Sequence, residues 1–473
     1  MPEPWFCATG AVVAEPAKSA KIWRVGTLTY TTGGLLVVIG WLLLAGFAWS
    51  MHEHSVGPMA QWYLDHLNIP NLSFGLFVMS FPSLIGLLSG PIISVRSDRH
   101  RGRLGRRIPF LLIMAPIAAL GMIGIAFTPV IARQLHASLL PAQNGTTVAL
   151  VCLGLSGAVF AFAIISTQSV FGGLINDVVP VEILGRFCGL LRAANLIAGI
   201  TFSYWIMGLV PARFTLILSA IGIFYCTAFM WGCHKVREGK YPRPSMHIAR
   251  PEPDTRNRTV GGGFIAEVRT YCRECFTHPY YLVLFAMLTA AALAFGPVNV
   301  FSIPYARSLG VDMNVYGKML AMTFLILLGL SWFLGWLCDR FHPLRMVMVA
   351  LAAYTLVAAW GSIYAGTSRA FLCAWVMHGV ISGCYWACVA SLGQRLYPHS
   401  RFAQFASAAA MLLAIGNMIM APAIGALIDV SGGCYRMTFA IGALLAMSAL
   451  GCAIHVHGRF TALGGPCAYV APE

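Results

Sequence analysis

The stretch SVRSDRHRGRLGRR at residues 94–107 decides the fold, because a shorter copy of it, GWLCDRFHPLR, returns at residues 335–345. Each stretch is a basic segment between two long apolar runs. Asp98 with Arg99 matches Asp339 with Arg340 in the second copy. A repeat that places the same basic segment between the same kind of apolar runs indicates an internal duplication.

A second match supports the duplication. WYLDHLNIPNLSFG at 62–75 aligns with PYARSLGVDMNVYG at 304–317, so that Tyr63 pairs with Tyr305 and Gly75 with Gly317. Further on, Arg186-Phe187 resembles Arg401-Phe402, and each pair follows a turn that contains proline. Three matches in the same order predict two related halves.

The composition is that of an integral membrane protein. Of 473 residues, 58% are hydrophobic and only 10% are charged. Apolar runs long enough to cross about 30 Å of hydrocarbon as helices recur along the chain. We expect an all-α integral membrane protein with twelve transmembrane helices, near 30–62, 73–95, 108–129, 147–174, 187–211, 213–234, 280–306, 315–337, 343–366, 370–394, 402–428 and 435–456.

The charges predict the orientation in the membrane. The formal net charge is +15, and with both termini in the cytoplasm all but six of the 31 Lys and Arg residues lie on the cytoplasmic side. The exceptions are Arg133, Arg213, Arg307, Lys318, Arg369 and Arg436. This positive-inside bias accounts for the charge without nucleic acid as a partner. We expect a multi-pass protein of the plasma (cell inner) membrane, with membrane lipid around it and a monomeric state.

The breaks between apolar runs predict the domain organisation. We expect a cytoplasmic tail at 1–26, a first six-helix bundle at 27–234 and a basic cytoplasmic linker at 235–279. A second six-helix bundle follows at 280–457, and a cytoplasmic tail at 458–473. The start of the chain has no short apolar core with a small-residue cleavage site, so we do not expect a removable signal peptide.

Neither a metal, a cofactor nor an enzymatic activity is predicted. The 14 cysteines are scattered, and the CxxC of Cys272 and Cys275 lacks the second ligand pair that a zinc site needs. The sequence contains no nucleophile–base pair and no glycine-rich phosphate loop. We therefore expect a protein that is not an enzyme.

Two six-helix bundles joined by a long basic loop resemble the major facilitator superfamily, whose members are transporters. The stretch at 94–107 is similar to the signature loop of that superfamily, and 335–345 to its shorter copy. The resemblance implies a gating role for the matching residues, which are Asp98, Arg99, Gly105, Arg106, Arg107, Asp339, Arg340 and Arg345. Asp98 is expected to lie against the positive N-terminus of a helix from the other half.

Residues 67–112 resemble plant sucrose/proton symporters, through LNIPNLSFG, SDR and GRRIPF. LINDVVPVEILGRFCGLLRAAN at 174–195 resembles the same group and the glycoside–pentoside–hexuronide transporters. Asn71 stands where the plant pattern has histidine. The resemblance implies that Asp177 and Arg186 join a cytoplasmic charge network that rearranges during transport.

Glu53 is the most unusual residue of the first span, where it lies between His52 and His54. Gly46, Ser50, Glu53 and Gly57 share one helical face. Tyr63 marks the outer end of the span, which puts Glu53 about 15 Å deep. A carboxyl there either carries the coupling proton, has a structural or substrate-binding role, or lies in a wet vestibule.

The other substrate or proton candidates are polar or aromatic residues of the predicted spans: Gln168, Arg192, Asn299, Trp375, His378 and Tyr385. Arg192 either extends to the membrane surface or binds solute groups in the cavity. Trp375 and Tyr385 suit a sugar ring but also suit packing. Asn299 either donates to solute or joins helices.

We therefore expect a secondary active transporter that moves a small solute, a sugar or glycoside, in symport with protons by alternating access. An efflux carrier for amphipathic drugs or metabolites is an alternative and would favour a more apolar cavity. A receptor or assembly factor that does not transport is a third hypothesis.

Overall fold

The computed structural model describes residues 22–25, 27–100, 102, 104–239, 269, 271, 273–398 and 401–472. The helices of the first half are α1 (Thr32–His66), α2 (Asn71–Gly75), η1 (Leu76–Ser80), α3 (Phe81–Arg99), α4 (Ile108–Ser138), α5 (Gly145–Val178), α6 (Val181–Thr201), η2 (Phe202–Ile206), η3 (Met207–Leu209) and α7 (Val210–Lys235). Those of the second half are α9 (Pro279–Ser308), α10 (Met313–Phe341), α11 (Pro343–Tyr364), α12 (Ser368–Val389), α13 (Leu392–Leu396), α14 (Phe402–Val430), α15 (Met437–Ala462) and α16 (Gly465–Ala468).

The chain crosses the membrane as helices, as expected for an all-α membrane protein. Eleven helical stretches of the described chain are long and apolar enough to span it, and one of them, Val181–Lys235, has 55 residues. A straight helix of that length would measure about 80 Å, far more than a bilayer is thick. The stretch turns back near Arg213, whose φ of −133° and ψ of 32° are not helical. It therefore supplies two crossings, α6 and α7, and the total is the expected twelve.

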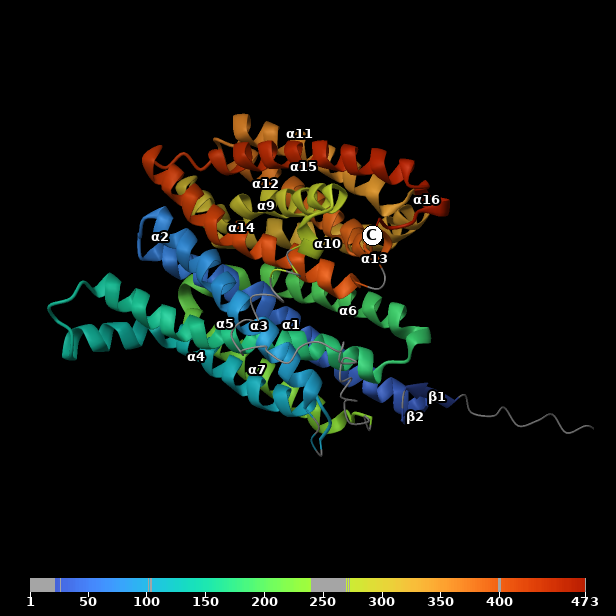
Figure 1. Ribbon diagram of the computed structural model, residues 1–473. Coiled ribbons are helices and arrows are strands. Elements are labelled where there is room, and N and C mark those ends of the chain that lie inside the picture. The colour runs from blue at the N-terminus through green and yellow to red at the C-terminus, as the bar shows by residue number, and fades with distance from the viewer. Residues whose placement is uncertain are drawn as a thin grey trace, which may run out of the picture.

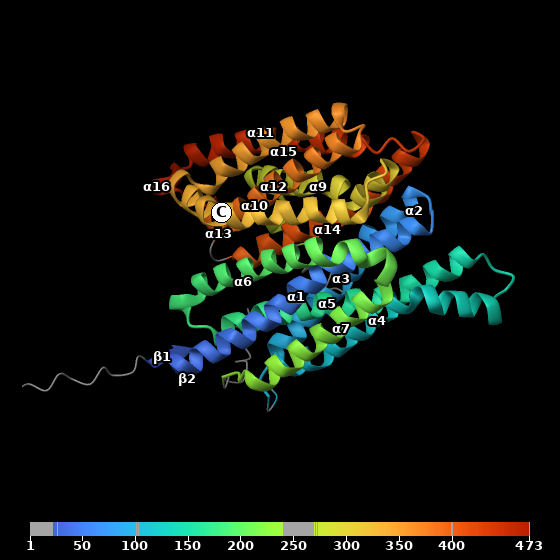
Figure 2. The same cartoon turned by 180° about the vertical axis from the view of Figure 1, so that it is seen from behind.

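The helices form two groups that lie side by side (Figures 1 and 2). In the first group α4 packs along α5 and α7, and α1 packs against α6 and α7. In the second, α15 packs against α9 and α11, and α12 against α10 and α11. The groups meet where α14 contacts α2, η1 and α3, and where α6 and η2 contact α10.

Polar side chains start several helices. The Asn144 side chain accepts a hydrogen bond from the Thr146 amide (2.9 Å), and Asp312 accepts one from Asn314 (2.9 Å). Such caps satisfy amides that have no partner within the helix. Side-chain caps of this kind begin α1, α5, α9, α10, α11 and α12, whereas α6, α7, α14 and α15 begin without one.

Several predicted ends were wrong. The third span continues to Ser138 and the fourth begins at Gly145, because both helices extend past the neighbouring helices as a hairpin (Figure 1). Hydropathy follows only the apolar part of such helices. The first span begins at Thr32, after a short antiparallel hairpin of β1 (Ile22–Val25) and β2 (Leu28–Thr31) that was not predicted.

Candidate functional site

The two ends of the helix bundle carry different loops. The signature end carries the loop Gly102–Arg107, and the opposite end carries Asn71 and Asp429.

The two halves are joined at the opposite end by hydrogen bonds. The Asp429 carboxylate of α14 accepts from the backbone amides of Asn71 and Leu72 (2.9 Å each) and from the Asn71 side chain (2.7 Å). A carboxylate at the N-terminus of a helix is favourable because the helix dipole is positive there.

A salt bridge between the halves joins residues that correspond in the repeat. Arg307 Nη1 lies 3.0 Å from the Asp65 carboxylate and also donates to the Asp65 carbonyl (2.7 Å). The two positions are 242 residues apart, which is the repeat offset. Equivalent positions can touch only near the pseudo-twofold axis that relates two repeats. The axis therefore passes between the ends of α1 and α9.

The paired glycines of the repeat, Gly75 and Gly317, lie against the backbone of the other half. A side chain on Gly75 would meet the carbonyl oxygen of Ala421 on α14 at 2.5 Å. One on Gly317 would meet the carbonyl oxygen of Ser203 on η2. Both glycines thus allow helices of opposite halves to approach closely at the opposite end.

Glu53 belongs to a hydrogen-bonded cluster between α1 and α6. The Asn195 side-chain amide donates to the Glu53 carboxylate (2.8 Å) and to the Ser50 hydroxyl (3.1 Å). Its carbonyl lies 3.3 Å from His54 Nε2, which must be the donor because an amide oxygen only accepts. Glu53 itself is exposed, whereas Ser50 is buried. His52 points elsewhere and packs against Trp49.

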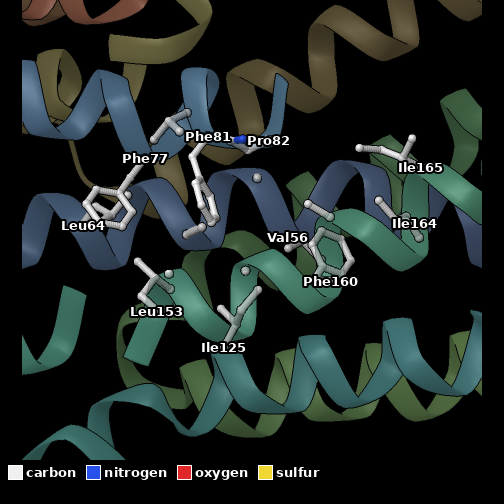
Figure 3. Close-up of a pocket in the computed structure, with 16 residues that line it drawn as sticks. Val56, Leu64, Phe77, Phe81, Pro82, Ile125, Leu153, Phe160, Ile164 and Ile165 are labelled. Atoms are coloured by element: carbon white, nitrogen blue, oxygen red, sulfur yellow. The ribbon is translucent and has the colours of Figure 1, made fainter. Parts of the chain in front are cut away.

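The predicted small and polar face of α1 serves two purposes. At Gly46 it packs so closely on Leu191 of α6 that a side chain would collide with it. At Gly57, one turn beyond Glu53, a side chain would meet nothing within 4 Å. Gly57 lines a cavity of about 220 Å³ whose other walls include Phe77 and Phe160 (Figure 3). The carboxylate therefore lies one turn from an apolar compartment between α1, α3 and α5.

The second half contains a polar cluster at the position that corresponds to Gly57. Asn299 of α9 lies at the repeat offset from Gly57 and is exposed. His378 Nε2 of α12 lies 3.1 Å from the Asn299 side-chain oxygen, and its Nδ1 lies 2.9 Å from the Tyr354 hydroxyl of α11. His378 Nε2 therefore donates to Asn299, which leaves the Asn299 amide group available for a solute.

The two aromatic candidates of α12, Trp375 and Tyr385, pack against other aromatic rings of the protein. Trp375 stacks on His378, with ring centroids 5.4 Å apart, and on Tyr316, 5.5 Å apart. Tyr385 is 1% exposed and packs against Phe295, with centroids 5.2 Å apart. Both rings pack among neighbours, whereas Asn299 is exposed.

Arg192 and Gln168 are both exposed. Arg192, on α6, lies close enough to Cys384 and Cys388 of α12 to act electrostatically on both thiols. Arg192 thus lies near a helix of the second half. Gln168, on α5, is one helical turn past Ile164 and Ile165, which line the apolar cavity.

The signature loop is fastened within the first half. Arg107 Nε lies 2.8 Å and Arg106 Nε 2.9 Å from the Asp177 carboxylate at the end of α5. The Glu238 carboxylate accepts from the backbone amides of Arg106 (2.7 Å), Arg107 (2.8 Å) and Ile108 (2.6 Å). Glu238 thus caps the start of α4. Gly105, beside it, has a φ of +105°, which suits glycine.

The remaining gating candidates make weaker contacts. Asp339 lies 3.2 Å from Arg395, but 81% of its side chain is exposed. Arg340 lies over the Trp336 ring at 5.7 Å, and Arg345 is exposed. Arg186 is exposed, and the recorded partners of Asp177 are Arg106 and Arg107. The side chains of Asp98 and Arg99, and the residue Cys272, lie outside the described part of the chain.

Five residues of these contacts were not predicted: Asp65, Asn195, Glu238, Tyr354 and Asp429. Asn195 is a polar residue inside an apolar run, which is a signal that the sequence contains, whereas Asp429 lies one residue past the predicted span 402–428. Glu238 lies in the basic linker, where a single carboxylate is not conspicuous. Tyr354 resembles any other aromatic residue of a span.

Solved structures with the same architecture are those of transporters. The chain superposes with a TM-score of 0.62 on a bacterial homologue of the human lysosomal transporter Spinster, at 13% identity over 93% of this chain and 98% of that one. It superposes at 0.65 on a bacterial homologue of the iron transporter ferroportin in the inward-facing state, at 14% identity over 89% and 99%. For the xylose transporter XylE from E. coli the TM-score is 0.58, at 12% identity over 88% and 95%.

The fold is thus that of a multi-pass membrane transporter of major facilitator type. A sequence profile described as the MFS_1 like family matches residues 191–440, which is more than half of the chain. The chain belongs to this family. A search of curated proteins finds no match.

Proposed function

We propose that the protein is a proton-coupled secondary transporter that takes up a small solute, a sugar or glycoside, by alternating access as a monomer. The observation that carries the proposal is the exposed Glu53 carboxylate in the middle of α1, hydrogen-bonded to Asn195 and adjacent to a cavity. It lies 13 residues before His66, about 20 Å from that end of the helix. An ionisable group at such a depth is a candidate for carrying a proton.

The solute would bind between the clusters of the two halves. Glu53 and Arg192 offer charge, Asn299 offers an amide donor, and these groups suit the hydroxyls of a sugar. Gln168 offers a further amide from α5. A D-xylose–proton symporter is among the solved structures with this architecture. The sucrose/proton symporter and glycoside–pentoside–hexuronide resemblances support the same solute class.

The moving units are the two halves, 27–234 and 280–457, and the signature end faces the cytoplasm of the cell, as the positive-inside bias favours. The bonds of Asp65 and Asp429 hold the opposite end closed in this state. During transport these bonds would break, while Asp98, Arg99, Arg340 and Arg345 close the signature end. Asp177 and Glu238 would keep the signature loop rigid through the change.

The decisive experiment measures uptake of labelled mono- and disaccharides into proteoliposomes, with and without a pH gradient. We expect gradient-driven uptake by the wild type and none by Glu53→Gln, which keeps the size of the side chain but carries no proton. Exchange of solute without a gradient should persist in the variant. Glu182→Gln, at the exposed start of α6, is the matched control and should behave as the wild type. Equal gradient-driven uptake by wild type and Glu53→Gln would refute proton coupling at this residue.

A second candidate function, export of amphipathic compounds, is favoured by the apolar walls of the 220 Å³ cavity. A solute with an apolar part would bury it against Phe77, Phe81 and Phe160. The discriminating measurement is the resistance of cells that overproduce the protein to a panel of amphipathic cations. Resistance together with no sugar uptake would replace the first proposal.

A further inference from the structure

A hollow of about 890 Å³ opens at the signature end of the second half, apart from the region between the halves. Three segments that are distant in sequence bound it: the approach to α9, the start of α14, and the stretch after α16. None of the residues of the proposed transport path lines it.

Hydrogen bonds fix the walls of this hollow. The Tyr281 hydroxyl of α9 donates to the Pro472 carbonyl (2.8 Å), and the Tyr469 hydroxyl donates to the Leu396 carbonyl (2.9 Å). The Tyr281 and Phe405 rings, with centroids 4.5 Å apart, form a buried floor. The stretch after α16 is therefore held against the helix bundle as one wall.

Two arginines, Arg273 and Arg401, line the hollow and are exposed. No ion pair is recorded for either guanidinium within the part of the chain that the structure describes, which ends at Pro472. The carboxylate among the lining residues, Glu274, accepts a hydrogen bond from Gln404 (2.8 Å). Guanidinium groups keep their charge at any physiological pH, so two of them in one hollow attract an anion.

The chemistry of the lining favours phosphate. Arginine binds phosphate through two parallel N–H donors, and a phosphate group can accept from two arginines at once. His278 stands at the N-terminus of the 30-residue helix α9, where the helix dipole adds positive potential. The volume exceeds that of a phosphate ion and has room for the group to which the phosphate is attached.

We infer that this hollow binds a phosphorylated anion through Arg273 and Arg401. The ligand is either the head group of an anionic phospholipid of the adjacent leaflet or a soluble phosphate ester. A basic pocket at the cytoplasmic ends of membrane helices is a common place for anionic head groups. A bound phosphate bridges the approach to α9 and the start of α14, and therefore stabilises the folded protein increasingly as the ligand concentration rises above its Kd.

The test uses the full chain in nanodiscs and measures its melting temperature. Discs of phosphatidylcholine alone are compared with discs that also contain phosphatidylglycerol. In a separate measurement, the discs of phosphatidylcholine alone are titrated with glycerol 3-phosphate or inorganic phosphate. The variants are Arg273→Gln with Arg401→Gln, and the matched control is Arg459→Gln, which removes one exposed arginine of the same end from α15, outside the hollow.

Phosphatidylglycerol or glycerol 3-phosphate should raise the melting temperature of the wild type and of Arg459→Gln. In the double variant the apparent affinity should fall about tenfold or more, since hydrogen bonds to charged groups are strong. A response to phosphatidylglycerol alone identifies a lipid head group, and a response to glycerol 3-phosphate in phosphatidylcholine identifies a soluble ester.

No stabilisation by any of these anions, or equal stabilisation of wild type and double variant, would overturn the inference. Should the double variant not fold, Arg273→Lys and Arg401→Lys replace it, since lysine keeps the charge but loses the paired donors. These single variants should then weaken binding relative to the wild type, and unchanged affinity in both contradicts the site. Glu53→Gln should leave every result unchanged, which separates this site from the transport proposal.

Discussion

At the scale of single residues, the local surroundings of α1 separate positions that look alike in the sequence. Gly46 and Gly57 lie on one face, yet one packs against α6 and the other opens onto a cavity. His52 and His54 flank the same glutamate, yet only His54 reaches Asn195. Asn195 thus organises the cluster by joining Ser50, Glu53 and His54 with one side chain.

Filling the cavity should impair transport without unfolding the protein. Gly57→Leu places a side chain in open space, so its melting temperature should stay near that of the wild type. Solute binding should weaken about tenfold, because crowding an occupied cavity costs about 1–3 kcal/mol. The measurement is uptake rate against solute concentration in proteoliposomes.

Gly40→Leu is the matched control for this prediction, since Gly40 lies on the same helix, has equally open surroundings and does not line the cavity. Its uptake should equal that of the wild type. If both leucine variants transport alike, the cavity beside Glu53 takes no part in solute binding.

At the scale of helices, the opposite end is held by contacts between backbone and side chain. Asp429 joins α14 to the first turn of α2, and the glycine pair lets α14 and α10 approach the other half closely. The Glu238 carboxylate, in the linker just after α7, makes a comparable cap on α4 of the first half. Identical chemistry therefore joins the two halves in one place and fastens a loop in the other.

Replacing Asp429 with asparagine should shift the protein toward a state that is open at the opposite end. The variant loses charge-assisted bonds to two amides of α2, and a loss of about 1–2 kcal/mol changes the ratio of states about tenfold. Spin labels at the ends of α5 and α15 that lie on the Asp429 side should report a larger population of long distances.

The control for the gate is Asp312→Asn, which alters a carboxylate that caps α10 within one half. It should lower stability slightly and leave the distance distribution as in the wild type. Long distances that appear equally in both variants would show that lost capping, and not the contact between halves, causes the shift.

At the scale of the whole molecule, the duplication explains where the halves meet. Asp65 and Arg307 are equivalent positions, yet they carry opposite charges and touch at the pseudo-twofold axis. Two identical charged residues there would repel each other. The divergence of the two repeats at this position thus turns a symmetric contact into an attractive one.

A charge exchange tests this role. Asp65→Arg alone places two arginines on the axis and should open that end, and Arg307→Asp alone should do the same. The combined exchange should restore the distances of the wild type. The bridge is half exposed, so the change in the ratio of states should be about fivefold or less. If the double exchange does not restore the closed end, the salt bridge is not what closes it, and the hydrogen bond from Arg307 to the Asp65 carbonyl is the important contact.

The sequence by itself determined the class of protein. Twenty-residue apolar runs require helices in a bilayer, and the repeated motifs 94–107 and 335–345 indicated two related halves. Glu53 stood out because a charge in an apolar run is costly wherever the helix packs. Each of these features is a property of a short stretch of sequence, so it can be recognised without knowing which distant segments come together in the fold.

Only the tertiary structure decided which residues meet. The partners Asn195 and Glu53 are 142 residues apart, and Asn71 and Asp429 are 358 apart. Helix rotation and tilt, set by packing, turned Trp375 and Tyr385 into the core and left Asn299 exposed. Hydropathy alone does not fix these rotations, because in a membrane the lipid-facing and the core-facing sides of a helix are both apolar.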